Sequence, residues 1–182
     1  MSWLLGSLTG FGQNLKVRAE ADRLRVSAGQ LHFLTGRALE KLHDGASVTY
    51  RLLLTIHSEK AGKTLARVLQ RFTVSYDLWE EKFSATRLDT PARSASNLSS
   101  AKLEAWCLDN LSLPLAELPA NRSFWVRLEF ETEEPRDPGN PDNSPLTLSS
   151  LIDIFSRRGH EDETVRGFDE VGPLTLTELR KK

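Results

Sequence analysis

The segment from Ser123 to Thr132 carries the clearest pattern of apolar and polar positions in the chain. Apolar side chains occupy every second position, and Trp125 and charged residues occupy the positions between them. A period of two is that of a β-strand, whose successive side chains point to opposite faces. The pattern therefore predicts a strand with one face on a core and the other toward water. The core-facing positions are Phe124, Val126, Leu128 and Phe130.

Four further segments have strand-like patterns. Residues 14–28 alternate, but the pattern slips by one position at Asp22, which predicts either a hairpin or one long bulged strand. Residues 47–57 are rich in β-branched and large apolar side chains, as in a central strand. Residues 64–77 alternate as well, although a helix also fits their first half, and a short strand is predicted over 83–88.

Two segments show the helical period instead. From Gly29 to Asp44 the leucines and alanines fall on one stripe, which predicts a helix followed by Gly45 as the residue after its C-cap. A second helix is predicted to begin at a cap residue, Asn97 or Ser99, and to run to about residue 110.

The remaining segments divide the chain into regions. Residues 89–96 are predicted to form a loop, and 113–119 a compact connector without a helix. The run after Thr132 has four prolines and almost no apolar residue, which is typical of a linker. The predicted regions are an apolar leader over 1–13, a core domain over 14–133, a proline-rich linker over 134–145 and a partly helical tail over 146–182.

Together these elements predict an α+β fold. The core would be an antiparallel β-sheet of five or six strands with two covering helices, and a β-sandwich with helical connections is the alternative. In the tail, residues 145–151 and 173–179 share the form P-L-T-L-[ST]-x-L. Thr175 and Glu178 have the spacing of a capping box, so each copy could begin a helix. The repeat is either a coincidence or a pair of short docking elements.

The charge composition bears on the class of partner. With 24 basic and 25 acidic residues the net charge is −1, so no overall field attracts nucleic acid, and no nucleic-acid partner is predicted. The apolar leader contains three glycines and is shorter than the ~20 residues that span a bilayer, so no transmembrane segment is predicted. As the sequence stands it indicates a cytoplasmic protein, or a protein of the cell envelope if an upstream signal segment is missing.

Candidate chemistry is sparse. His32 and His43 share the first predicted helix but would lie roughly 16 Å apart along its axis, too far to ligate one metal ion. Cys107 lies beside Leu103 and Trp106 on one helical stripe, as a small apolar core residue would. No catalytic residue, metal site or cofactor is predicted, and the chain is not expected to be an enzyme.

The block from about residue 15 to 130 resembles a bacterial family of uncharacterised single domains, often associated with the cell envelope. The resemblance rests on Leu24-Arg-Val-Ser-Ala, on Phe33-Leu34 with Ala38-Leu39 and Gly45, on residues 71–77, and on Val126-Arg127-Leu128. It implies a single domain of unknown function and no activity. Members of that family often begin with a signal or anchor segment, and no such segment is predicted in the sequence as it stands.

The predicted function is a non-catalytic protein-interaction or scaffold module that binds other proteins, as in a multi-subunit assembly. Trp125 falls on the outward side of its strand, so it either lies beneath a helix or connector or belongs to an exposed apolar patch. The alternatives are a carrier or sensor domain for a hydrophobic ligand and a small hydrolase that uses Cys107. The predicted partner-binding residues are Trp125 and, in the tail, Leu148, Leu151, Ile152 and Phe155.

Overall fold

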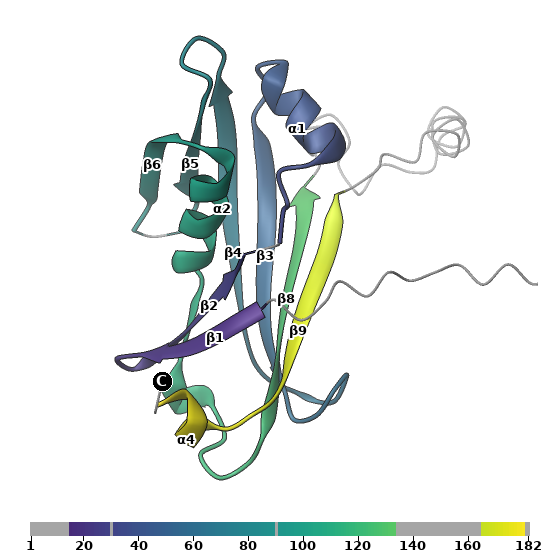
Figure 1. Cartoon of the computed structure of the whole chain (residues 1–182), viewed down its shortest axis with the longest axis vertical. Helices are drawn as coiled ribbons and strands as arrows, with labels where there is room; N and C mark the ends of the chain where they lie inside the picture. Colours follow the sequence, from purple (N-terminus) through teal and green to yellow (C-terminus); the bar gives the residue numbers. More distant parts are fainter. Residues whose placement is uncertain (1–14, 30, 90, 134–164, 181–182) are drawn as a thin grey trace, which may run out of the picture.

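The computed structural model describes residues 15–29, 31–89, 91–133 and 165–180, and the fold is given for these residues. They form nine strands, three α-helices and one short 3-10 helix, whose order along the chain can be followed in Figure 1. The strands are β1 (Leu15–Glu20), β2 (Arg23–Ala28), β3 (Val48–His57), β4 (Thr64–Asp77), β5 (Lys82–Arg87), β6 (Arg93–Leu98), β7 (Ser112–Pro114), β8 (Phe124–Glu133) and β9 (Arg166–Leu174). The helices are α1 (Gly36–His43), α2 (Ser100–Asp109), η1 (Leu115–Glu117) and α4 (Leu176–Leu179).

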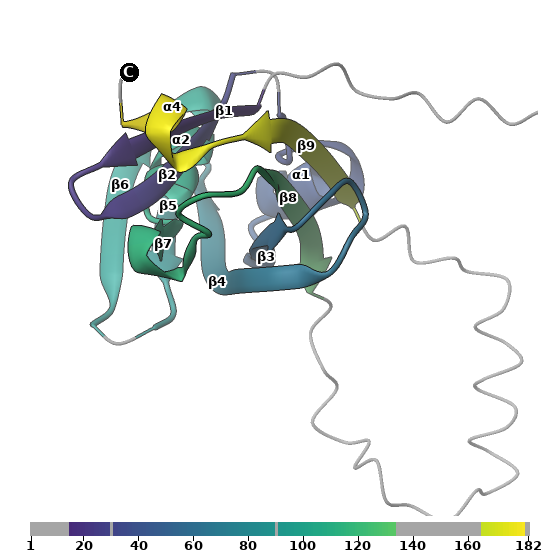
Figure 2. The same ribbon diagram turned by 90° about the horizontal axis from the view of Figure 1, so that it is seen from below.

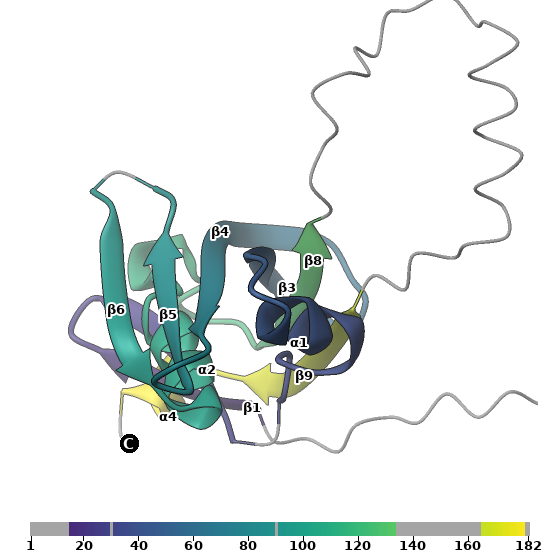
Figure 3. The ribbon, with the colours of Figure 1, turned by 90° about the horizontal axis from the view of Figure 1, so that it is seen from above.

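The strands form two antiparallel sheets. The large sheet has six strands in the order β6-β5-β4-β3-β8-β9, and the small sheet has three in the order β1-β2-β7. The large sheet curves, and α1, α2 and the small sheet lie on its concave side (Figures 2 and 3). The predicted α+β class and the six-stranded antiparallel sheet under two helices are confirmed. None of the helices in the described part of the chain is long and apolar enough to cross a membrane.

The segments with alternating apolar positions form strands, and their apolar positions face the core. Leu52 and Leu54 on β3 are fully buried on the concave side of the sheet. Arg51, on the same strand, points to the convex side. The slip at Asp22 is a hairpin turn, in which Ala21 has a φ of 54° and the two flanking strands pair from Leu15 to Ala28. Of the two sequence interpretations, the hairpin is therefore the one observed.

The first helix is shorter than the predicted one. It begins at Gly36 rather than Gly29, and residues 31–35 before it have no regular secondary structure, with a bend at Leu34. The backbone amides of Phe33 and Leu34 donate hydrogen bonds to a carboxylate oxygen of Glu104 on α2, at 2.8 and 3.1 Å. Both amides are thus bonded to a side chain of another element rather than to carbonyl groups of a helix of their own. Gly45 follows the C-cap with a φ of 83°, as predicted.

Two connecting segments also differ from expectation. The predicted loop over 89–96 contains most of β6, whose polar residues give no apolar alternation but pair with β5 through the backbone. The predicted connector over 113–119 contributes β7 and the single turn η1. Leu113 pairs with Leu24 there, and both side chains are fully buried, so this connector completes the small sheet.

Residues 166–180, at the end of the predicted tail, are part of the folded body. β9 pairs with β8 and forms the sixth strand of the large sheet, and α4 follows it. The capping box at Thr175 and Glu178 is confirmed, because each side chain accepts a hydrogen bond from the other residue's backbone N–H. The linker 134–145, the other copy of the repeat and the helix expected near residue 150 lie outside the described residues.

Candidate protein-binding face

The large sheet presents its convex side to solvent, and we call this side the open face. Both large helices and the small sheet lie on the concave side, and no described element packs on the convex one. The open face is formed by the outward side chains of β3, β4, β8 and β9, which alternate with the buried positions of the same strands. A sheet with one uncovered side is common among antiparallel sheets, but that side is usually polar.

Several apolar side chains interrupt the polar pattern of the open face. Leu53 on β3 lies directly opposite Leu69 on β4, whose side chain is 40% exposed. At the edge of the sheet, Phe168 on β9 is 50% exposed and pairs with Glu129. Leu65 at the start of β4 is exposed as well. The open face therefore offers apolar contact area that the described fold itself does not use.

Ion pairs connect the charged side chains of the open face. Arg51 contacts Glu131 at 2.6 Å, Arg71 contacts Glu133 at 2.9 Å, and the same glutamate lies 3.3 Å from Arg51. Arg127 on β8 pairs with Glu129 at 2.9 Å. Exposed pairs of this kind stabilise a fold by only about 0–1 kcal/mol each. Their main consequence is that the charges of the open face largely cancel.

Trp125 lies at one end of the open face and is half-buried. Its indole ring rests on the backbone of Gly172 in β9, because a Cβ at that position would lie 2.6 Å from the ring. The ammonium group of Lys60, in the turn between β3 and β4, is 5.8 Å from the ring centroid. The ring is thus covered in part by a neighbouring strand and a connector, and its remaining surface faces solvent.

Phe168 forms the other aromatic contact of the open face. The guanidinium carbon of Arg127 lies 4.1 Å from the centroid of its ring, within the range of a cation–π interaction. An arginine stacked on an exposed ring is held flat against the sheet. The outer surface of its guanidinium group stays available for contact. No strand is predicted around Phe168 from the sequence, and Phe168 is not one of the predicted partner-binding residues.

The surroundings of the Cys107 thiol differ from those of a nucleophilic cysteine. Cys107 on α2 is fully buried in the core, and its burial, with a smaller contribution from the Glu104 carboxylate, raises the pKa of the thiol. A thiol with a raised pKa is protonated at neutral pH, whereas nucleophilic cysteines are exposed and have lowered pKa values. The geometry of this site gives no support to a hydrolase that uses Cys107.

The buried carboxylate of Glu104, near this thiol, is the main feature that the sequence analysis did not predict. Glu104 is 6% exposed and, besides the two backbone amides, its side chain lies 3.0 Å from Nδ1 of His32. Burial, followed by the same carboxylate, raises the pKa of Tyr50, whose hydroxyl group has no hydrogen-bond partner among the described residues. Glu104 is three positions before Cys107 and so lies on the same side of α2. That spacing could have indicated its burial.

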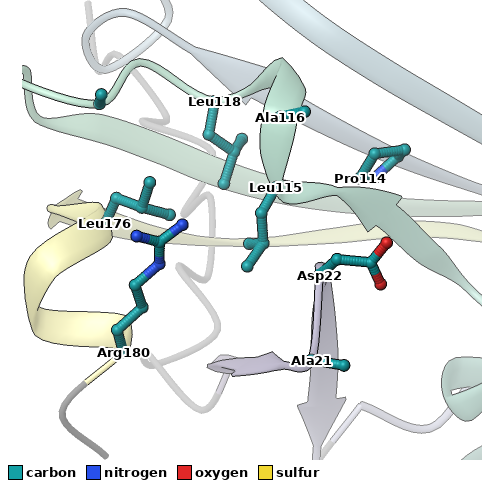
Figure 4. A pocket seen from close by; sticks show the side chains of 9 residues that line it. Ala21, Asp22, Pro114, Leu115, Ala116, Leu118, Leu176 and Arg180 are labelled. Atoms are coloured by element: carbon teal, nitrogen blue, oxygen red, sulfur yellow. The ribbon is translucent and has the colours of Figure 1, made fainter.

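An apolar groove of about 440 Å³ lies near the C-terminal end of the described chain (Figure 4). It is formed by the β1–β2 turn, η1 and α4, with Asp22 and Arg180 among its lining residues. The carrier hypothesis places its ligand between the sheet and the helices, and this groove lies elsewhere. The leucines that line it, such as Leu115 and Leu176, are themselves mostly buried.

The comparisons with known proteins give no relative. No protein-family model, no curated protein and no solved structure matches this chain. The resemblance to a bacterial family of uncharacterised domains therefore stays a prediction. Of the predicted partner-binding residues, Trp125 is placed on the open face. The other four, Leu148, Leu151, Ile152 and Phe155, lie outside the described residues and stay predictions.

Proposed function

We propose that this chain is a non-catalytic module that binds another protein through the open face of its large sheet. The observation that carries the proposal is an uncovered sheet side on which exposed apolar and aromatic side chains alternate with paired charges. Protein interfaces combine aromatic residues and arginine in this way, with a polar surround.

The charge balance supports a protein partner over other classes of partner. The outward side chains of β3, β4, β8 and β9 include five arginines and four glutamates, so the open face has almost no net charge. Binding to nucleic acid or to an anionic membrane needs a surplus of positive charge. A protein surface with its own mixture of acids, bases and apolar groups is the complementary partner. The residues counted are Arg51, Arg67, Arg71, Arg127, Arg166, Glu129, Glu131, Glu133 and Glu170.

Phe168 and Trp125 are the side chains best placed to anchor the partner. Each presents a ring fixed by a neighbour, Arg127 in one case and the backbone of Gly172 in the other. Rings that are already held in place lose little freedom on binding, and aromatic residues dominate the energetics of many interfaces. Truncating such an anchor commonly weakens binding by about 2 kcal/mol or more, which is over tenfold.

The test compares two exposed aromatic residues. A partner is first recovered with the wild-type chain and identified, and its affinity is then measured with purified proteins. Phe168→Glu should weaken that affinity more than tenfold. Trp79→Glu serves as the matched control, because Trp79 is 96% exposed but lies in the β4–β5 turn, away from the open face. Equal affinity for wild type and Phe168→Glu, or loss with Trp79→Glu alone, would contradict the proposal.

The predicted docking residues between Leu148 and Phe155 need a separate variant. Removing the whole of 146–182 would also remove β9 and α4, which belong to the fold. An internal deletion of 146–160 leaves both elements in the chain. If the open face alone carries binding, the affinity of this deletion for the purified partner equals that of the wild type, and a loss assigns part of the interface to the predicted residues.

A further inference from the structure

We infer that the cleft between the small sheet and the β5–β6 edge of the large sheet binds a small phosphate-bearing anion. This cleft, which we call the arginine cleft, has a volume of about 280 Å³ and is separate from the open face. Its residues come from β2, β5, β6, β7 and the end of α2, and these elements are spread over the sequence. They are Arg23, Arg25, Arg87, Arg93, Asp109, Asn110 and Ser112.

The position of two of these arginines is unusual for a sheet. Arg87 on β5 and Arg93 on β6 lie directly opposite each other, and both are on the concave side because Arg87 also pairs with the buried Phe72. Like charges at directly opposite positions repel each other and destabilise the strand pair. An anion between the two guanidinium groups would turn this repulsion into attraction to a shared ligand.

The ion pairs around the arginine cleft do not neutralise all of its positive charge. Glu20 lies 2.9 Å from Arg25, and Asp89 lies 3.4 Å from Arg87, so two of the four guanidinium groups have a carboxylate partner. The one carboxylate in the lining, Asp109, is paired with Arg18 at 3.4 Å.

Two guanidinium groups remain without a carboxylate among the described residues. Among the described residues, the Arg23 guanidinium group is hydrogen-bonded only to Ser112, through the hydroxyl at 2.8 Å and the backbone carbonyl at 3.4 Å. Arg93 has no hydrogen bond or ion pair with any described residue. About two positive charges are therefore uncompensated, which matches the charge of a phosphate monoester at neutral pH.

Burial and donor geometry favour the same ligand. The Arg87 side chain is only 14% exposed, and its Nε makes no hydrogen bond that satisfies normal geometry. Each guanidinium group has five N–H donors in a planar fork, which matches the oxygens of a phosphate group. Since ligand pockets for larger molecules span roughly 300–1,000 Å³, a cleft of about 280 Å³ suits one phosphate with a small organic group.

The experiment measures binding of glycerol 3-phosphate and inorganic phosphate to the purified full chain by calorimetry at low salt. Arg93→Ala is the test variant, because Arg93 is exposed on an edge strand and holds no part of the described fold together. Arg67→Ala is the matched control, an exposed strand arginine on the open face that likewise has no partner among the described residues. Far-ultraviolet circular dichroism and the melting temperature without ligand confirm that all three proteins are folded.

The wild type should bind glycerol 3-phosphate, and Arg93→Ala should weaken the affinity at least tenfold, the loss expected for a charge-assisted hydrogen bond. Arg67→Ala should change it less than twofold. A similar affinity for Arg93→Ala and wild type, or no measurable binding by the wild type, overturns the inference. Binding of a phosphoserine peptide without binding of glycerol 3-phosphate overturns it as well, because the ligand would then be a protein. Phe168→Glu should leave phosphate affinity unchanged, so this inference and the proposed function fail separately.

Discussion

The buried carboxylate of Glu104 provides a sharp test of what holds the fold together. Glu104 accepts hydrogen bonds from the backbone amides of Phe33 and Leu34 and is almost fully buried on α2. Glu104→Ala would leave both amides without an acceptor inside the protein. Glu104→Gln would retain an uncharged acceptor oxygen in the same place.

The expected magnitudes follow from these two amides. A buried polar group left without a partner costs about 1–3 kcal/mol, so Glu104→Ala should lower the free energy of unfolding by about 4 kcal/mol. A hydrogen bond to a charged acceptor contributes about 1 kcal/mol more than one to a neutral acceptor. Glu104→Gln should therefore lower the free energy of unfolding by about 2 kcal/mol. Since small domains are stable by only about 5–15 kcal/mol, both effects are large.

Urea unfolding followed by tryptophan fluorescence at neutral pH measures these differences. Glu40→Ala is the matched control, because Glu40 is exposed on α1 and its side chain makes no hydrogen bond or ion pair with any described residue. It should change the free energy of unfolding by less than about 0.5 kcal/mol. If Glu104→Ala is within about 1 kcal/mol of the wild type, then Glu104 does not hold the segment before α1 against α2.

Two further predictions concern the core and the sheet edge. Because burial, and to a smaller extent Glu104, raise the pKa of Cys107, alkylation at neutral pH should be on the order of a hundredfold slower in the native than in the urea-unfolded protein. The folded chain also keeps a proton that the unfolded chain releases above about pH 8.5, so stability should fall as the pH rises beyond that value; rapid native alkylation would refute both statements. Gly172→Ala places a Cβ 2.6 Å from the Trp125 ring and should lower the free energy of unfolding by about 1–3 kcal/mol in the same urea assay. Gly29→Ala, with nothing within 4 Å of its Cβ, is the control, and equal stability of the two variants would show that the ring moves aside freely.

The strands that the sequence predicts are those whose apolar positions alternate. β3, β4 and β8 each bury one side and expose the other, so the period of two appears directly in the sequence. The hairpin between β1 and β2 was also recoverable, because an inserted turn shifts the pattern by one position.

The elements that the sequence does not predict depend on distant partners. The start of α1 is set by Glu104, which lies far along the chain from Phe33. β6 is a polar edge strand that depends on backbone pairing with β5. β9 contains Gly167 and Gly172, residues that are rare in strands, but both provide space for aromatic rings on β8.

The candidate sites were predictable to different degrees. Trp125 was recognisable because an aromatic ring occupied an outward position of a well-defined strand. The arginine cleft was not, since Arg23 and Arg25 reach Arg87 and Arg93 only after two separate sheets have formed. Linear spacing carries no information about such a cluster, because each arginine alone looks like an ordinary solvated charge.

The antiparallel pairing of β8 with β9 has a consequence for the segment that joins them. Glu131 lies opposite Arg166, so the chain leaves and re-enters the sheet at neighbouring points, and a turn of two residues could make the same connection. The two ends of the described chain on either side of residues 134–164 are therefore already close together in the sheet. Doubling the length of a flexible connection between two such points costs only about 0.6 kcal/mol, so the pairing of β8 with β9 tolerates connections of very different lengths.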